Sequence, residues 1–127
     1  MKLFKRYITR EREALMRAGV RVRLIGDRVR LDDSLVLLMD ELELLTSDND
    51  RVHLTIAINY GGRDEVARAT KRLAHDVAQG KLDPRSVDEE TLPRYLDTYF
   101  LPDPDLVIRT SGEARISNFL LWQSAYS

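Results

Sequence analysis

Two short strand-like runs on either side of one strongly helical segment constrain the fold of this 127-residue chain more than any other feature. The runs are VRVRLI at 20–25 and VHLTIAIN at 52–59, and both place apolar residues at alternate positions. Between them, residues 32–46 carry leucines and a methionine on one helical stripe, with Asp32 or Asp33 as the N-cap. Strand, helix and strand in this order favour a parallel sheet.

The rest of the chain continues this alternation of patterns. The other expected elements are a helix over 2–18, a helix over 63–79, a short acidic helix from about Asp88 that restarts at Pro93, a third strand over 104–110, and a helix from Ser117 onward. The apolar stripe expected on the 63–79 helix is Val66, Thr70, Leu73 and Val77. The order predicts an α/β domain with a mainly parallel sheet flanked by helices. Three strands make a thin sheet, which is therefore expected to be incomplete.

Composition excludes several classes of function. The net charge of -1 argues against a surface for nucleic acid, so any anion site has to be local. The absence of cysteine excludes disulfides and thiolate metal sites, and His53 and His75 have no partner at metal-ligand spacing. We find no signal peptide and no run long enough for a transmembrane segment, so we expect a cytoplasmic protein, at most peripheral to a membrane surface.

Two arginines and a serine mark the junction between the expected third strand and last helix. Arg109 ends the strand pattern, at the sheet edge where open α/β proteins bind ligands, and Arg115 and Ser117 follow after a turn. Guanidiniums hold phosphate oxygens bidentately, and the N-terminus of a helix attracts anions. The alternative is a set of surface ion pairs with Glu113. The strand-end position and the serine favour a ligand site of diphosphate size.

Two other features allow both a structural and a functional interpretation. The glycines of NYGG at 59–62 could admit a phosphate, but they match no dinucleotide or P-loop pattern, and turn formation is the simpler interpretation. The leucine stripe that includes Leu35, Leu38 and Leu42 is most simply core. It could also wall a cavity for a long hydrocarbon, and periodicity does not separate the two.

The final segment, DLVIRTSGEARISNFLLWQSAYS, resembles the signature of the cis-prenyltransferases, the undecaprenyl diphosphate synthase family. The signature runs D-L-x-I-R-T-x-G-E-x-R-x-S-N-F-L-L-W-Q-x-x-Y, and each fixed position is met. GVRVRLIGD at 19–27 and INYGGRDEV at 58–66 are similar to earlier segments of the family, in the same order. The resemblance covers essentially the whole chain.

The resemblance implies an activity and a role for each matching residue. The family condenses isopentenyl diphosphate onto an allylic diphosphate such as farnesyl diphosphate, with Mg²⁺, to form the cis double bonds of a long polyprenyl diphosphate lipid carrier. Arg109, Arg115 and Ser117 match positions that bind the diphosphate of isopentenyl diphosphate, with Glu113 supporting them. The stripe of Leu35, Leu38 and Leu42 would wall the tunnel for the growing chain, and a homodimer is expected.

The resemblance also implies that residues 1–127 are a partial domain, truncated at both ends. The family's H-x-x-x-M-D-G-N-x-R-W segment, with its catalytic aspartate, and its S-x-E-N-W-x-R-P segment have no counterpart here. A metal-binding glutamate would follow Ser127. No catalytic or metal-binding residue is therefore expected within the chain, and we expect the chain alone to be inactive. The alternatives are a non-catalytic partner subunit of a heteromeric cis-prenyltransferase and a general phosphate-binding α/β module.

Overall fold

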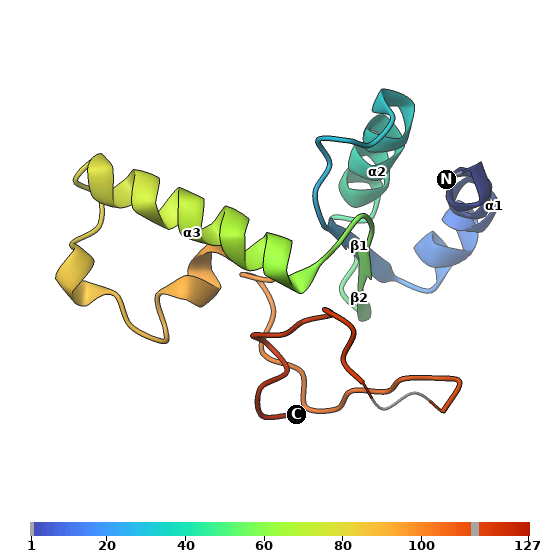
Figure 1. Ribbon diagram of the computed structural model, residues 1–127. Coiled ribbons are helices and arrows are strands. Elements are labelled where there is room, and N and C mark those ends of the chain that lie inside the picture. Colours follow the sequence, from blue (N-terminus) through green and yellow to red (C-terminus); the bar gives the residue numbers. More distant parts are fainter. Residues whose placement is uncertain (1, 113–114) are drawn as a thin grey trace. The chain divides into compact units, whose positions relative to one another are not determined.

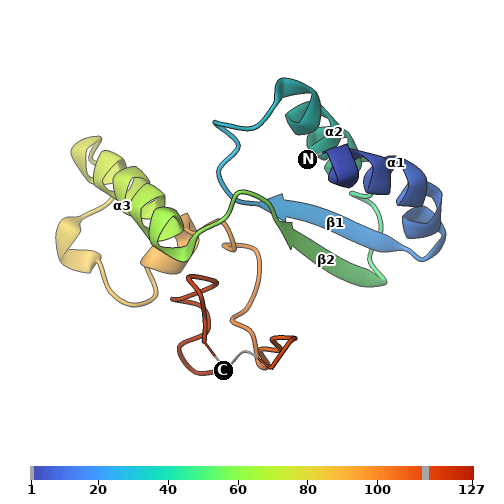
Figure 2. The ribbon, with the colours of Figure 1, turned by 45° about the vertical axis from the view of Figure 1, so that its right-hand side comes forward.

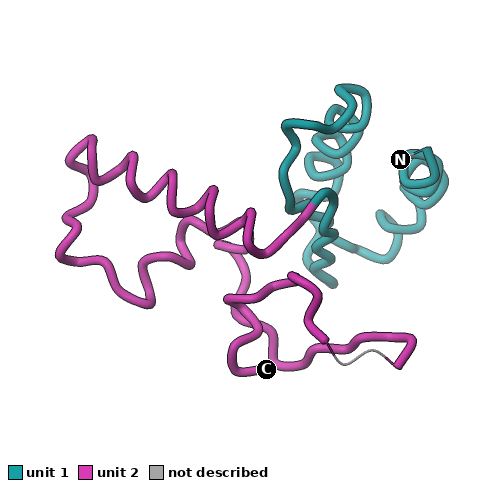
Figure 3. The backbone as a smooth tube through the Cα atoms, viewed as in Figure 1, with its two compact units in different colours: residues 1–59 teal, residues 60–127 magenta. Residues whose placement is uncertain are grey.

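The computed structural model describes residues 2–112 and 115–127 of the chain (Figure 1). The chain forms two compact units, Met1–Asn59 and Tyr60–Ser127 (Figure 3). Across the described residues, no helix combines the length and the apolar character that crossing a membrane requires.

Unit 1 alternates helices and strands as the sequence predicts. Its elements are α1 (Lys2–Arg17), β1 (Val20–Ile25), α2 (Asp33–Leu45) and β2 (Val52–Ala57). The strands pair in parallel, with Val20 opposite Val52 at one end and Ile25 opposite Ala57 at the other. The expected parallel α/β arrangement is therefore confirmed, here as a two-stranded sheet among the described residues.

The core of unit 1 lies between β1 and the two helices, which pack together on one face of that strand (Figure 2). Alternate residues of β1 point into this core because side chains alternate across a strand. Ile8 enters the core from α1, whereas Leu3 and Tyr7 of the same helix are exposed. The buried core residues are Ile8, Val20, Val22, Leu24, Leu35, Met39, Leu42 and Ile58.

Asp32 is the N-cap of α2, one of the two candidates that the sequence offered. Its Oδ1 accepts a hydrogen bond from the backbone N–H of Ser34 over 3.3 Å. Its Oδ2 accepts a hydrogen bond from Nζ of Lys5 in α1 over 2.8 Å. The hydrogen bond from Lys5, followed by those from Ser34, lowers the pKa of Asp32 to about 2. One exposed carboxylate thus begins α2 and joins it to α1.

Unit 2 is organised around α3 (Gly62–Ala78), followed by two single-turn 3-10 helices, η1 (Pro84–Ser86) and η2 (Leu92–Tyr95). The expected acidic helix from Asp88 does not form, and η2 instead contains the proline at which a restart was predicted. Arg68 of α3 binds Asp97 through two parallel hydrogen bonds of 2.9 Å each. This bidentate pair attaches the segment after η2 to the helix.

The buried face of α3 differs from the predicted stripe. Gly62, Glu65 and Ala69 are buried, whereas Val66 is half-buried and Thr70 is exposed. The predicted buried face is wrong because the neighbouring segments pack against the side of the helix that carries small residues and one carboxylate.

Two expected elements near the C-terminus are absent from the described residues. Residues 104–110 form no strand, because a strand pattern needs a hydrogen-bonding neighbour and no described segment supplies one. The apolar side chains of Leu106 and Ile108 are 73% and 79% exposed as a result. The expected helix from Ser117 is a series of turns, since left-handed backbone angles at 117, 118 and 120 interrupt it.

Candidate functional site

The three substrate-binding side chains that the sequence predicts line one open hollow in unit 2. This hollow, which we call the arginine hollow, has a volume of about 850 Å³ and is lined by Arg109, Arg115 and Ser117. Apolar side chains, among them Ile116 and Phe119, complete its wall. The structure therefore brings two guanidiniums and one hydroxyl to the same cavity, beside apolar surface.

A hydrogen bond joins the two ends of the loop that carries the arginines. Nη1 of Arg109 donates to the carbonyl oxygen of Arg115 over 2.7 Å. Within the loop, Ser111 and Gly112 adopt left-handed backbone with φ of 66° and 68°, which produces a tight turn. A guanidinium carries five N–H donors, so this one bond leaves Arg109 with donors for an anion. Glu113, the predicted supporting residue, lies outside the described residues.

The paired glycines of NYGG allow another part of unit 2 to approach α3 closely. A Cβ on Gly62 would lie 2.9 Å from Cγ of Leu121 and 3.1 Å from the carbonyl oxygen of Asn118. That oxygen accepts a hydrogen bond from the N–H of Gly62 over 2.7 Å. Close packing thus accounts for glycine at this position, and not the turn formation that the sequence suggested, since neither Gly61 nor Gly62 has a positive φ.

Glu65 is a buried carboxylate that joins several segments of unit 2 and that the sequence did not predict. It is 1% exposed and accepts hydrogen bonds from the Tyr60 hydroxyl over 2.5 Å and from Nε2 of Gln123 over 2.9 Å. Its other oxygen accepts the N–H of Asp97 over 2.8 Å. Burial, together with the hydrogen bond to Glu65, raises the pKa of Tyr60 well above its usual value. A glutamine inside the apolar run LLWQSAY is the one sequence signal that could have indicated a buried polar partner.

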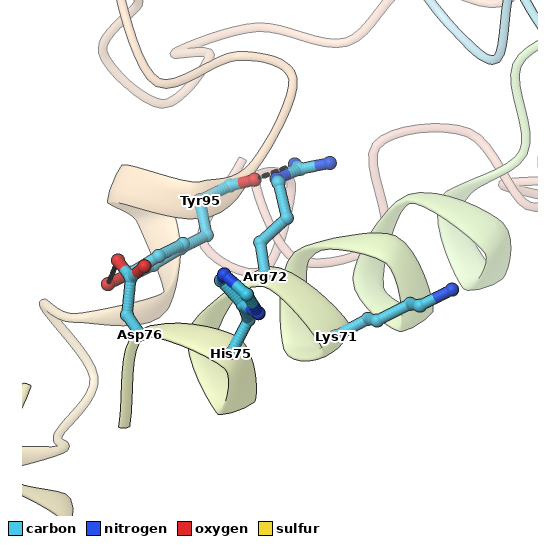
Figure 4. A pocket seen from close by; sticks show the side chains of 5 residues that line it. All are labelled: Lys71, Arg72, His75, Asp76 and Tyr95. Atoms are coloured by element: carbon cyan, nitrogen blue, oxygen red, sulfur yellow. Dashed lines mark hydrogen bonds between the residues drawn. The ribbon is translucent and has the colours of Figure 1, made fainter. Parts of the chain in front are cut away.

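A second hollow of about 410 Å³ lies between α3 and η2 (Figure 4). Arg72 donates to the carbonyl oxygen of Tyr95, and the Tyr95 hydroxyl donates to Asp76 over 2.8 Å. The hydrogen bond to Asp76 raises the pKa of Tyr95. His75 also borders the hollow, while Lys71 points away from the other side chains in the view. These bonds attach η2 to the helix, so the hollow is explained by local structure.

The predicted tunnel leucines lie in unit 1. Leu35 and Leu42 are buried in its core, and Leu38 packs against that core while remaining half-buried. The leucines therefore pack as core residues, which was the simpler interpretation of the stripe. Their role as a tunnel wall stays a prediction. Within the described residues, no three His, Asp or Glu side chains gather where they could hold a metal ion.

Comparison with known proteins shows that this chain matches one family. The family model described as putative undecaprenyl diphosphate synthase matches residues 1–127. Isoprenyl transferase 2 of Bradyrhizobium diazoefficiens is 51% identical over 125 residues, which are 98% of this chain and 50% of that protein. The (2E,6E)-farnesyl-diphosphate-specific ditrans,polycis-undecaprenyl-diphosphate synthase of Xylella fastidiosa strain 9a5c is 50% identical over 127 residues, which are 100% of this chain and 48% of that protein.

Solved structures agree with the sequence comparison. A probable undecaprenyl diphosphate synthase from Campylobacter jejuni superposes with a TM-score of 0.83 at 38% identity, covering 99% of this chain and 57% of that one. Lavandulyl diphosphate synthase from Lavandula x intermedia, solved in complex with dimethylallyl diphosphate, gives a TM-score of 0.78 at 33% identity, covering 97% and 57%. Fold and sequence similarity thus define a parallel α/β protein of the prenyltransferase class.

Within that class, the chain belongs to the undecaprenyl diphosphate synthase family of cis-prenyltransferases. It spans about half the length of the curated relatives that it matches.

Proposed function

We propose that this chain is the part of a cis-prenyltransferase that binds isopentenyl diphosphate, and that Arg109, Arg115 and Ser117 bind its diphosphate. The observation that carries the proposal is the convergence of these three side chains on one hollow. They stand at the arginine and serine positions of the family signature.

The chemistry of the arginine hollow suits a small diphosphate ester. Two guanidiniums offer charge-assisted, bidentate hydrogen bonds to phosphate oxygens, and the Ser117 hydroxyl adds one donor. The apolar wall at Ile116 and Phe119 offers contact for a short hydrocarbon tail. A ligand with a diphosphate at one end and five carbons at the other matches both parts of the lining.

In the proposed reaction, the bound isopentenyl diphosphate attacks an allylic diphosphate, such as farnesyl diphosphate, through its terminal double bond. A carbon–carbon bond forms as the allylic diphosphate leaves, and loss of a proton from the condensed product then gives the new cis double bond. The contribution of this chain is positioning: a fixed diphosphate holds the double bond toward the allylic carbon. Mg²⁺ is the cofactor that the resemblance implies. The described residues form no cluster of His, Asp or Glu suited to a metal ion.

The parent protein would repeat this condensation to build a long-chain polyprenyl diphosphate lipid carrier, as a cytoplasmic homodimer that acts near a membrane surface. The 127 residues alone are expected not to elongate, because the family's catalytic aspartate segment has no match in them.

The experiment that tests the proposal compares two ligands that share a diphosphate ester and differ in their tail. The full chain is titrated calorimetrically with isopentenyl diphosphate and with methyl diphosphate. We expect isopentenyl diphosphate to bind about tenfold more tightly, because the hollow buries part of the five-carbon tail. Equal affinities would instead indicate a general phosphate-binding module. Elongation by the purified chain, supplied with isopentenyl and farnesyl diphosphates and Mg²⁺, would contradict the predicted inactivity.

A further inference from the structure

Asn118 connects the segment that carries Arg115 and Ser117 to the first turn of α3. Its side-chain Oδ1 accepts a hydrogen bond from the N–H of Arg63 over 2.9 Å. Its own carbonyl oxygen accepts one from the N–H of Gly62 over 2.7 Å. The first N–H groups of a helix have no partner within the helix, so Asn118 caps α3 from 55 residues further along the chain.

The start of α3 leaves room for Asn118 only because it is built from glycine. A Cβ on Gly61 would lie 3.0 Å from Nδ2 of Asn118, and a Cβ on Gly62 would press on the Asn118 carbonyl oxygen and on Leu121. A side chain at Gly62 would push the segment away from the helix, whereas one at Gly61 would displace the end of the Asn118 side chain. The two glycines therefore allow Asn118 to pack against the start of α3.

The backbone beside the arginine hollow needs such support. Ser117 and Asn118 have φ of 53° and 62°, in the left-handed region. Asparagine adopts this conformation readily and serine less so, and consecutive left-handed residues persist only where surrounding contacts hold them. Arg115 and Ser117 both line the hollow, so the backbone held at Asn118 determines where their side chains point.

A separate contact attaches the same segment further along. Gln123, 5% exposed, donates from Nε2 to Glu65 and to Oγ1 of Thr98, each over 2.9 Å. This anchor does not involve Asn118. Loss of the Asn118 contacts is therefore expected to disturb the hollow locally while the segment stays attached to α3.

We propose that Asn118, seated on Gly61 and Gly62, is a positioning residue for the diphosphate site: by capping α3 it fixes the backbone from which Arg115 and Ser117 reach the ligand. The inference rests on the proposed function. It gives Gly61 and Gly62 a role in substrate binding without any contact between these glycines and phosphate.

The test uses two variants that disturb the contact from opposite sides. Asn118→Ala removes the side-chain acceptor, and Gly62→Ala adds a methyl group against Asn118 and Leu121 without removing any polar group. The matched control is Asn59→Ala in unit 1. Asn59 is also left-handed, with φ of 51°, and its Nδ2 donates to the carbonyl oxygen of Asp27 over 2.8 Å.

The Kd for isopentenyl diphosphate is measured for the full 127-residue chain well below each variant's unfolding midpoint. We expect Asn118→Ala and Gly62→Ala each to raise the Kd about tenfold, because the site is no longer preorganised. Asn59→Ala should lower the unfolding midpoint and leave the Kd unchanged. If both Asn118→Ala and Gly62→Ala lower the midpoint but bind as tightly as the unmodified chain, Asn118 is merely structural. The inference is then overturned, while the proposed function stands. If the unmodified chain does not bind isopentenyl diphosphate, the proposed function fails and the inference fails with it.

Discussion

Nε2 of Gln123 donates a hydrogen bond to Oε1 of Glu65 across 2.9 Å, joining two buried residues that lie 58 positions apart. The same carboxylate accepts hydrogen bonds from the Tyr60 hydroxyl and from the N–H of Asp97. Glu65 thus connects the start of unit 2, the segment after η2 and the C-terminal segment. Because this last segment carries part of the arginine hollow, the stability of the proposed site depends on a group that contacts no ligand in the proposal.

Replacing Glu65 by alanine should destabilise unit 2 strongly. The change leaves three donors without their acceptor, two of them on the side chains of Tyr60 and Gln123, and buried unsatisfied polar groups are costly. We expect the free energy of unfolding to fall by about 3 kcal/mol. Urea unfolding followed by the fluorescence of Trp122, the single tryptophan of the chain, measures it. Glu90→Ala, at an exposed position, is the control and should change the value by less than about 0.5 kcal/mol.

The Lys5–Asp32 contact should make the stability of unit 1 depend on pH in the acid range. The pKa of Asp32 is about 2 in the folded chain, below the value of about 4 for an unfolded aspartate. Its stabilising contribution is therefore present above pH about 4 and is lost as the pH falls from about 4 to about 2. Asp32→Asn keeps a capping side chain but removes the charge, so it should flatten the pH dependence of unfolding in this window. Circular dichroism measures this, with Asp48→Asn in an exposed loop as the control. An unchanged slope in Asp32→Asn would refute the assignment.

Gly26 should tolerate no side chain, because the end of β1 passes very close to the segment after β2. Its φ is 120°, and a Cβ would lie 1.9 Å from the carbonyl oxygen of Ile58. Gly26→Ala should lower the free energy of unfolding by about 3 kcal/mol or more. Gly80→Ala is the matched control, with φ of 75° and no atom within 4 Å of the added Cβ. It should cost about 1 kcal/mol, for the left-handed backbone alone. Similar losses in the two variants would show that contact with Ile58 does not matter.

The sequence predicts unit 1 well because its signals are local. Alternation over 20–25, the leucine stripe and the cap at Asp32 each act within a few residues, and together they specify a strand, a helix and a parallel partner. The prediction fails at 104–110, where an equally clear strand pattern has no neighbour to pair with among the described residues. A pattern shows what a segment can form, whereas pairing depends on the rest of the sheet.

The candidate site, too, could be predicted only in part from the sequence. Arg109, Arg115 and Ser117 are close in sequence and match a family signature, so they could be found without a structure. The contact of Asn118 with Arg63 and that of Glu65 with Gln123 each span more than fifty residues, and neither Asn118 nor Glu65 belongs to an apolar pattern. The glutamine inside LLWQSAY indicates at most that a buried polar partner exists, and no local signal in a single sequence identifies that partner or the capping contact of Asn118.

The most direct test of the central claim is a calorimetric titration of isopentenyl diphosphate into the double variant Arg109→Ala, Arg115→Ala. Removing two guanidiniums and their charge-assisted hydrogen bonds should raise the Kd at least about 100-fold. The control, Arg85→Ala with Arg94→Ala, changes the net charge equally within unit 2 at two residues that do not line the arginine hollow. It should bind like the unmodified chain. If instead the first variant keeps the affinity of the unmodified chain while the control loses it, Arg109 and Arg115 do not hold the diphosphate, and the proposed site is wrong.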